Sequence, residues 1–262
     1  MPFPTVKRVI YKKNPLDLVV CQLRFPPILK IDTTLPADFQ DKIRKEFPNF
    51  SDSTNNPFPN ELKSHIPENI LIQLQKNSIR KNYEFTSDDN IWKINLTRTF
   101  IALSCKKYER WELFKQKLDI PLTALLDIYS PIFFTRIGLR YIDVIRRSIL
   151  GLESVSWNRL LNDNILGLLG SNDLHDYIQN FENLYELTLS DNESKVKILT
   201  KFVEYKNNNE KCYMIDSDFY NDKKIKVETA KKKLDFFNKR ATRLIQWCIT
   251  DKLHKAMEPT KL

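Results

Sequence analysis

A chain of 262 residues with 42% hydrophobic and 11% aromatic residues can bury one large core or two modest ones, which excludes an intrinsically disordered protein. No apolar run reaches the ~18–20 residues of a membrane span, and Met1 to Arg8 lack the apolar core of a signal peptide, so we expect a cytoplasmic protein without a membrane partner. Of the net charge of +9, +7 lies in residues 222–262, which hold twelve Lys or Arg and five Asp or Glu. The basic character belongs mainly to the C-terminal region, and such a charge suits a polyanionic partner.

Residue usage argues against several classes of enzyme. The chain has only four glycines, and their spacing matches neither a Walker loop nor a dinucleotide-binding loop. It also has no G-x-S-x-G motif. None of the three histidines stands in a metal-ligand spacing. The cysteines are far apart within apolar patterns, which is typical of reduced, buried thiols: Cys21, Cys105, Cys212 and Cys248. We therefore expect no cofactor, and a binding protein is favoured over an enzyme.

The first half of the chain is predicted to be mainly strands. The segment 49–69 is rich in Asn, Ser and Pro without a sustained period, so a surface loop is expected there. Ser87 to Asn90 should form a turn between two antiparallel strands. The expected strands are Val6–Ile10, Leu16–Phe25, Leu71–Leu74, Tyr83–Thr86, Ile91–Leu96 and Thr99–Cys105.

Two helices are predicted in this half. The first opens at Leu35-Pro36, carries an apolar stripe at four-residue spacing and is ended by Pro48. The second covers Trp111 to Tyr129, where apolar residues fall at helical spacing. Pro121 should bend or divide this second helix.

The longest strand-like run, Phe133 to Ile145, lies at the middle of the sequence. Alternation places the apolar side chains on one face, as core: Phe133, Ile137, Leu139, Tyr141 and Ile145. Arg136, Gly138 and Arg140 share the other face, and the glycine leaves a notch between two cations. These three residues are a candidate anion-binding site for a carboxylate or phosphate. The alternative is that the arginines pair with carboxylates on neighbouring strands.

The second half repeats the element order loosely. A helical region through Trp157 to Leu168 precedes strands at Leu184–Leu189, Val196–Tyr205 and Cys212–Asp216, and a long helix follows. Strand, helix, antiparallel strands and helix therefore occur twice. This order predicts an α+β fold with two loosely similar lobes, residues 1–131 and 132–262, in one compact unit.

The last helix carries the clearest helical pattern. Its apolar residues step by three and four along one seam: Val227, Ala230, Leu234, Phe237, Ala241, Leu244 and Cys248. Packing across the protein's own sheet is favoured over docking on a second chain. Six cations lie off the seam: Lys231, Lys232, Lys233, Lys239, Arg240 and Arg243. A solvated face is the simpler interpretation, and contact with nucleic acid or an acidic protein is the functional one.

Asp216 and Asp218 would share a face if their strand continues, and two such carboxylates could hold Mg²⁺. Capping of the following helix, or pairing with basic residues, is the simpler alternative. Under the metal hypothesis the protein is an enzyme that acts on phosphate esters. A further alternative is a small-ligand sensor with a pocket between the two lobes.

Several motifs occur together along almost the whole chain. They are Asn14-Pro15-Leu16 followed by Val20 to Pro27, Pro36 to Gln40 with Ile43-Arg44 and Phe47-Pro48, Ala102-Leu103-Ser104 with Tyr108 to Trp111, Thr135 to Ile142, and the Asp216-x-Asp218 strand with the closing helix. In combination they resemble a sporadically distributed family of bacterial proteins of about this length whose function is uncharacterised. The resemblance implies no catalytic residue. A patchy distribution implies accessory genes such as those of mobile elements, toxin–antitoxin systems or phage-defence loci.

The leading hypothesis from the sequence is a non-enzymatic binding component that engages an anionic partner, either nucleic acid or an acidic protein. Under this hypothesis Arg136 and Arg140 bind a discrete anion. The basic helix supplies a more diffuse attraction.

Overall fold

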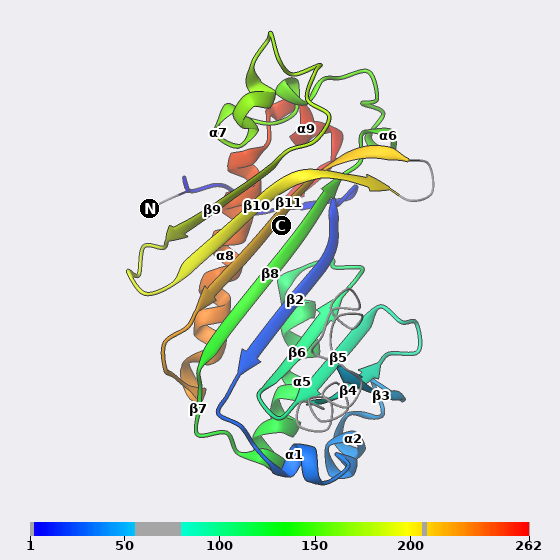
Figure 1. Cartoon of the computed structure of the whole chain (residues 1–262), viewed down its shortest axis with the longest axis vertical. Coiled ribbons are helices and arrows are strands. Elements are labelled where there is room, and N and C mark those ends of the chain that lie inside the picture. Colours follow the sequence, from blue (N-terminus) through cyan, green and yellow to red (C-terminus); the bar gives the residue numbers. More distant parts are fainter. Residues whose placement is uncertain (1–2, 56–79, 206–208, 262) are drawn as a thin grey trace, which may run out of the picture.

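The protein has the α+β fold that the sequence predicts, with antiparallel sheets and packed helices. The computed structural model describes residues 3–55, 80–205 and 209–261. Nine strands form one antiparallel sheet in the order β3-β4-β5-β6-β2-β8-β11-β10-β9 (Figure 1). Their bounds are β2 (Leu16–Arg24), β3 (Asn49–Asn55), β4 (Arg80–Thr86), β5 (Trp92–Thr97), β6 (Phe100–Cys105), β8 (Arg136–Ile145), β9 (Glu182–Thr188), β10 (Lys195–Tyr205) and β11 (Glu210–Asn221).

Two small sheets join segments that are distant in sequence. β1 (Val9–Tyr11) pairs with β13 (Pro259–Lys261), which fastens the N-terminal segment to the C-terminal one. β7 (Phe133–Phe134) pairs with β12 (Ile225–Lys226) and so fixes the connection that leads into the last long helix.

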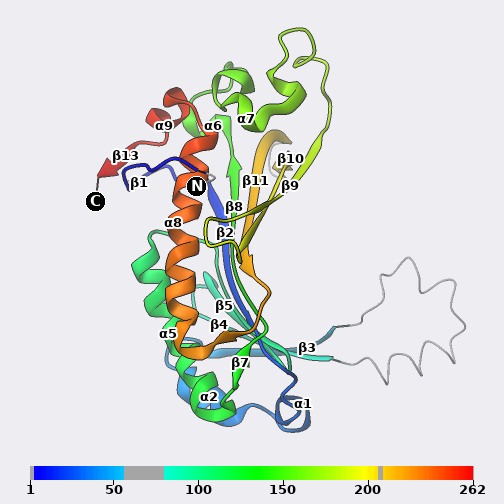
Figure 2. The same ribbon diagram turned by 90° about the vertical axis from the view of Figure 1, so that its left-hand side faces the viewer.

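The two long helices lie on the same face of the large sheet (Figure 2). α5 (Trp111–Tyr129) follows β6, and α8 (Ala230–Cys248) follows β11. The shorter helices are α1 (Lys30–Thr33), α2 (Ala37–Ile43), α6 (Arg147–Leu150), η1 (Trp157–Arg159), α7 (Asp163–Leu166), η2 (Gly167–Gly170), η3 (Val227–Thr229) and α9 (Asp251–Ala256). Among the helices of these three described ranges, none combines the length and apolar character of a membrane span.

Both halves of the chain contribute to this sheet with the same element order. In the first half, β2 is followed by short helices, by β3 to β6 and by α5, and β6 pairs with β2. In the second half, β8 is followed by short helices, by β9 to β11 and by α8, and β11 pairs with β8. β2 and β8 pair with each other at the centre of the sheet. The two predicted lobes therefore share one sheet and one hydrophobic core.

The central strand buries the face that alternation predicts. Ile137, Leu139 and Ile145 are fully buried, and Arg140 on the other face is exposed. The predicted run is divided at Thr135, because β7 pairs with β12 whereas β8 pairs with β2 and β11, and the Thr135 amide donates to the Arg24 carbonyl at 2.8 Å. Consequently Phe134 is fully buried, whereas Phe133, expected in the core, is only half-buried.

Some sequence-based boundaries were wrong. The segment 49–55, predicted to be loop, is the edge strand β3, in which Phe50 packs 5.3 Å from the ring of Phe85. Its polar composition concealed the strand, since an edge strand needs few apolar anchors. α5 runs through Pro121 without division, because its buried face, including Leu118 and Leu122, is held against the core on both sides of the proline. The predicted strand Leu71–Leu74 and the rest of the predicted loop lie outside the described residues.

Candidate functional site

The two strand arginines lie on the face of the sheet away from α8, and each is paired with an aspartate of β11. Arg140 Nε donates to Asp216 Oδ1 at 2.7 Å, and Arg140 Nη2 donates to Asp216 Oδ2. Arg136 Nη2 donates to Asp218 Oδ2 at 2.7 Å. Hydrogen bonding to Asp216 raises the pKa of Arg140. The structure thus contains the cross-strand pairs of arginine and carboxylate that were the alternative to an anion-binding site. An external anion would have to compete with two carboxylates for these arginines.

The notch expected above Gly138 is filled by the protein's own Arg136. A Cβ built on Gly138 would lie 3.1 Å from Arg136 Cζ and closer still to Nη1. The same guanidinium lies 4.8 Å from the ring centre of Tyr220, the residue directly opposite Gly138 on β11. The glycine therefore makes room for an internal side chain, which corrects the prediction of a notch open to an anion.

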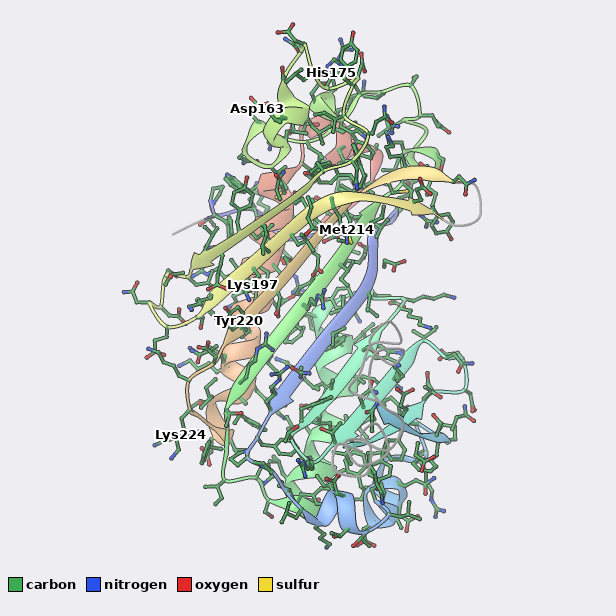
Figure 3. All side chains as sticks on the ribbon, in the orientation of Figure 1. Asp163, His175, Lys197, Met214, Tyr220 and Lys224 are labelled. Atoms are coloured by element: carbon green, nitrogen blue, oxygen red, sulfur yellow. The ribbon has the colours of Figure 1, made fainter. Side chains whose placement is uncertain are left out.

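Polar contacts continue across the outer strands of this face, where Lys197 and Tyr220 lie next to each other (Figure 3). The Tyr220 hydroxyl donates to Glu186 Oε2 at 3.0 Å, and Lys197 Nζ lies 3.4 Å from the same oxygen. Arg24 differs, because it is exposed and donates from Nε to Gln22 at 2.8 Å without an ion pair to any described carboxylate. Most charge on this face is therefore balanced locally.

The metal hypothesis gains no support from the geometry. Asp216 and Asp218 do share a face, because β11 continues to Asn221, but both are bound to arginines. In the described ranges, no group of three or more His, Cys, Asp or Glu side chains is placed to hold a metal ion. The carboxylate pair balances the arginine pair.

The apolar seam of α8 packs on the protein's own sheet, as favoured from the sequence. Every seam residue from Ala230 to Cys248 is buried. Tyr141 of β8 adds a polar contact, since its hydroxyl donates to Asn238 Oδ1 of α8 at 3.0 Å. This contact surface accounts for the seam without a second chain.

The six cations off the seam do not form a uniform solvated face. Lys231 lies 2.7 Å from Asp119 of α5, and Lys233 lies 3.1 Å from Asp191. Arg240 is only 7% exposed, donates to Ser190 Oγ at 2.9 Å and covers the ring of Phe236, so its expected place on a solvated face was wrong. Lys232 and Lys239 are exposed, and Arg243 is half-buried. The helix therefore offers fewer available cations than its sequence indicates.

A cluster of available cations lies instead at the start of α8. A groove of about 520 Å³ is lined by five lysines and two carboxylates: Lys223, Lys224, Lys226, Lys232, Lys233, Asp191 and Glu193. Lys233 lies 3.1 Å from Asp191 and 3.9 Å from Glu193. The other four lysines are exposed and form no ion pair with a carboxylate of the described residues. We call these four, Lys223, Lys224, Lys226 and Lys232, the groove lysines.

The backbone that carries the groove lysines is anchored. Asn221, 1% exposed, accepts a 2.9 Å hydrogen bond from the Lys223 amide, and Lys226 pairs with Phe133 in the small sheet. Lys224 lies beyond the end of β11 (Figure 3), with its Nζ 4.3 Å from the centre of the Phe133 ring. Lys223, Lys224 and Lys226 belong to the basic C-terminal region, but they lie before the helical seam and so were not among the residues predicted to bind. The signal that could have found them is the presence of five lysines within ten residues, 223–232, just before and inside a helix start.

The first turn of α8 is positively charged, whereas negative charge is favourable in the first turn of a helix. The helix N-terminus carries a partial positive charge, so acidic residues are stabilising in the first turn. α8 has no acidic residue in this turn and begins Ala230-Lys231-Lys232-Lys233. Asp119 and Asp191 balance the first and third lysines, whereas Lys232 faces the groove. The positive potential is thus concentrated where the groove lies.

No protein-family model matches the chain, and no curated protein matches it in sequence. Any function of the protein must therefore be inferred from the geometry of the chain itself.

Proposed function

We propose that the protein is a binding component that engages an anionic partner, with nucleic acid as the leading case, through the groove lysines at the start of α8. The observation that carries the proposal is the set of four exposed lysines around one groove. None of these four forms an ion pair with a carboxylate of the described chain. Lysines of this kind attract phosphate groups without reading sequence.

The strand arginines have a secondary place in this proposal. Arg136 and Arg140 are each bound to an aspartate, so their net contribution to the external field is small. The groove lysines and the first turn of α8 act in the same direction, because an anion in the groove would be attracted by both. An anchored backbone also limits the entropy that would be lost on binding.

The test is fluorescence anisotropy of labelled single- and double-stranded DNA and RNA at several salt concentrations. The variant replaces the four groove lysines with glutamine. The matched control replaces four other exposed lysines that form no ion pair in the described residues: Lys30, Lys45, Lys106 and Lys252. Both variants lose the same number of positive charges, so a difference between their affinities shows that the position of the lysines matters.

We expect the wild type and the control to bind with an affinity that falls steeply with salt. The groove variant should bind more weakly, with a salt slope reduced by up to about 3–4 on double-stranded DNA, since each phosphate contact contributes about 0.9. Equal loss in both variants would contradict a localised site. If no nucleic acid binds at low salt, the acidic-protein alternative is tested with a poly-glutamate peptide, and absence of that binding too would overturn the proposal.

A further inference from the structure

A cavity of about 90 Å³ lies between the sheet and α8, beside the N-terminal segment. Tyr141 and Asp143 of β8 and Ser217 of β11 line it from the sheet, and Asn238 and Leu244 line it from α8. β1 and the residues just before α5 complete the wall. The cavity is therefore bounded by elements from both halves of the chain, and it lies on the opposite face of the sheet from the arginine–aspartate pairs.

Asp143 is the unusual residue of this cavity. It is only 5% exposed, and it makes no hydrogen bond or ion pair with any described residue. Buried carboxylates in proteins are normally paired or hydrogen-bonded, because an isolated buried charge is costly. Burial, with a smaller effect of Asp216, raises the pKa of Asp143 to about 7. A carboxyl group that lines a cavity without a partner can accept hydrogen bonds from a ligand.

The other charged groups that line the cavity do not compensate Asp143. Arg8 donates to both carboxylate oxygens of Glu112, at 2.6 and 2.8 Å, so its charge is balanced. Glu109 and Arg110 are exposed and carry opposite charges. The remaining titratable groups are the phenols of Tyr11, Tyr108 and Tyr141, whose pKa values burial raises, and α8 contributes no charged side chain to the lining. An ionised Asp143 is thus the unbalanced charge that faces the cavity.

We propose that this cavity binds a small primary ammonium ion, with the ammonium group on the Asp143 carboxylate and the carbon atoms against Ile215 and Leu244. The charge argument selects a cation, and the tyrosine rings that line the cavity favour an organic one. The volume limits its size, since a cavity of ~150 Å³ accepts benzene and a water molecule occupies ~30 Å³. An ion of about two to five non-hydrogen atoms fits these limits. This site is independent of the groove lysines.

The N-terminal segment holds the cavity closed on one side. The Tyr11 hydroxyl lies 2.7 Å from His254 Nδ1, and Gln246 Nε2 donates to the Lys7 carbonyl at 3.1 Å. These contacts, with the pairing of β1 to β13, keep the wall in place. A ligand that fits inside therefore stabilises the folded chain in proportion to its occupancy.

The test is the thermal unfolding of the whole chain at pH 8 with methylammonium, propylammonium or tetraethylammonium chloride, against sodium chloride at equal ionic strength. We expect methylammonium or propylammonium to raise the midpoint, and tetraethylammonium, which exceeds the cavity, to act like sodium. The apparent affinity should be roughly 30-fold weaker at pH 5.5 than at pH 8, because the carboxyl group is then mostly protonated. No increase in the wild type at tens of millimolar probe would overturn the proposal.

Asp143→Asn keeps the shape of the side chain and removes its charge, so it should abolish the response. Asp218→Asn, a change on the other face of the sheet, is the control and should retain it. Ala241→Leu is a second, independent variant, since Ala241 lines the cavity and a larger side chain would fill it. Equal responses in the wild type, Asp143→Asn and Ala241→Leu would show that the probes bind elsewhere, and would overturn the proposal.

Discussion

The guanidinium of Arg136 lies directly over Gly138, two residues farther along the same strand. This position lets Arg136 reach Asp218 at 2.7 Å and stack on Tyr220 at 4.8 Å. A glycine inside a strand usually costs about 0.5–1 kcal/mol relative to alanine. Here the missing side chain is what allows the arginine to fold back onto the sheet, so glycine and arginine depend on each other.

Gly138→Ala should therefore have an effect that changes sign with residue 136. In the wild type, the new methyl group displaces the guanidinium and costs about 1–2 kcal/mol of contacts, which outweighs the gain from removing a strand glycine. In an Arg136→Ala background the same change should stabilise by about 0.5–1 kcal/mol. Urea unfolding of the four proteins in a double-mutant cycle measures the coupling. A coupling near zero would show that the two residues act independently.

Arg240 and Lys239 are adjacent on α8 but should respond very differently to glutamine. Arg240 is buried, bonded to Ser190 and stacked on Phe236 at 4.6 Å, whereas Lys239 is exposed. We expect Arg240→Gln to cost about 1–3 kcal/mol of folding free energy and Lys239→Gln to stay within about 0.5 kcal/mol. Chemical denaturation of both variants provides the check. Similar values for both would mean that Arg240 is an ordinary surface cation.

The contrast between these neighbours shows what periodicity can and cannot predict. The seam of α8 was predictable, because seven apolar residues repeat at helical spacing and all but Val227 are buried. The burial of Arg240 was not, since it depends on Ser190 at the turn that links β9 to β10, fifty residues away. The groove also depends on contacts between distant segments, because it brings Asp191 together with residues 223–233. Charge counting locates a basic segment but not the cations that stay available.

Strand alternation was more informative for the two faces of the sheet. It placed Arg136 and Arg140 on one face and a core on the other, and the possibility of cross-strand carboxylate partners was open from the sequence. Asp143 was detectable by the same rule, because it has the phase of Ile137, Leu139 and Tyr141 and so belongs to the buried face. The partner register could not be predicted. That β11 lies beside β8 is a result of topology, and sequence order alone does not determine it.

Trp111 and Asp235 join the long helices of the two halves. Trp111, 4% exposed, donates from Nε1 to Asp235 Oδ1 at 2.7 Å, and Lys115 Nζ lies 3.0 Å from the same oxygen. Asp235→Ala leaves the buried indole donor without its acceptor, so we expect a loss of about 1–2 kcal/mol in urea unfolding. Lys115→Met removes only the partly exposed ion pair and should cost less than about 0.5 kcal/mol. Equal losses of unfolding free energy in the two variants would mean that the ion pair between Lys115 and Asp235, and not the hydrogen bond from Trp111, stabilises the contact.

Asp143 should give the pH dependence of stability a distinctive sign. Its pKa is about 7 in the folded chain and ~3.9 in an unfolded one, so the folded state binds more protons between these values. The contribution of Asp143 to stability therefore falls as the pH rises from about 4 to about 7. The cost of burying the ionised carboxylate, at most about 4 kcal/mol, is fully present only above pH 7.

Asp143→Asn has no charge to bury, so it should be more stable than the wild type by about 1–4 kcal/mol at pH 8 and close to it at pH 4, with about a third of the difference already present at pH 5. Other groups act in the opposite direction, such as Glu112, whose pKa is lowered to about 2 by its hydrogen bonds with Arg8, so that its contribution is lost as the pH falls. Because both proteins share those groups, the difference between their unfolding free energies isolates Asp143. Urea unfolding at each pH from 4 to 8 gives this difference. A difference that stays constant with pH would mean that Asp143 has the same pKa in the folded and the unfolded chain, which would contradict this prediction.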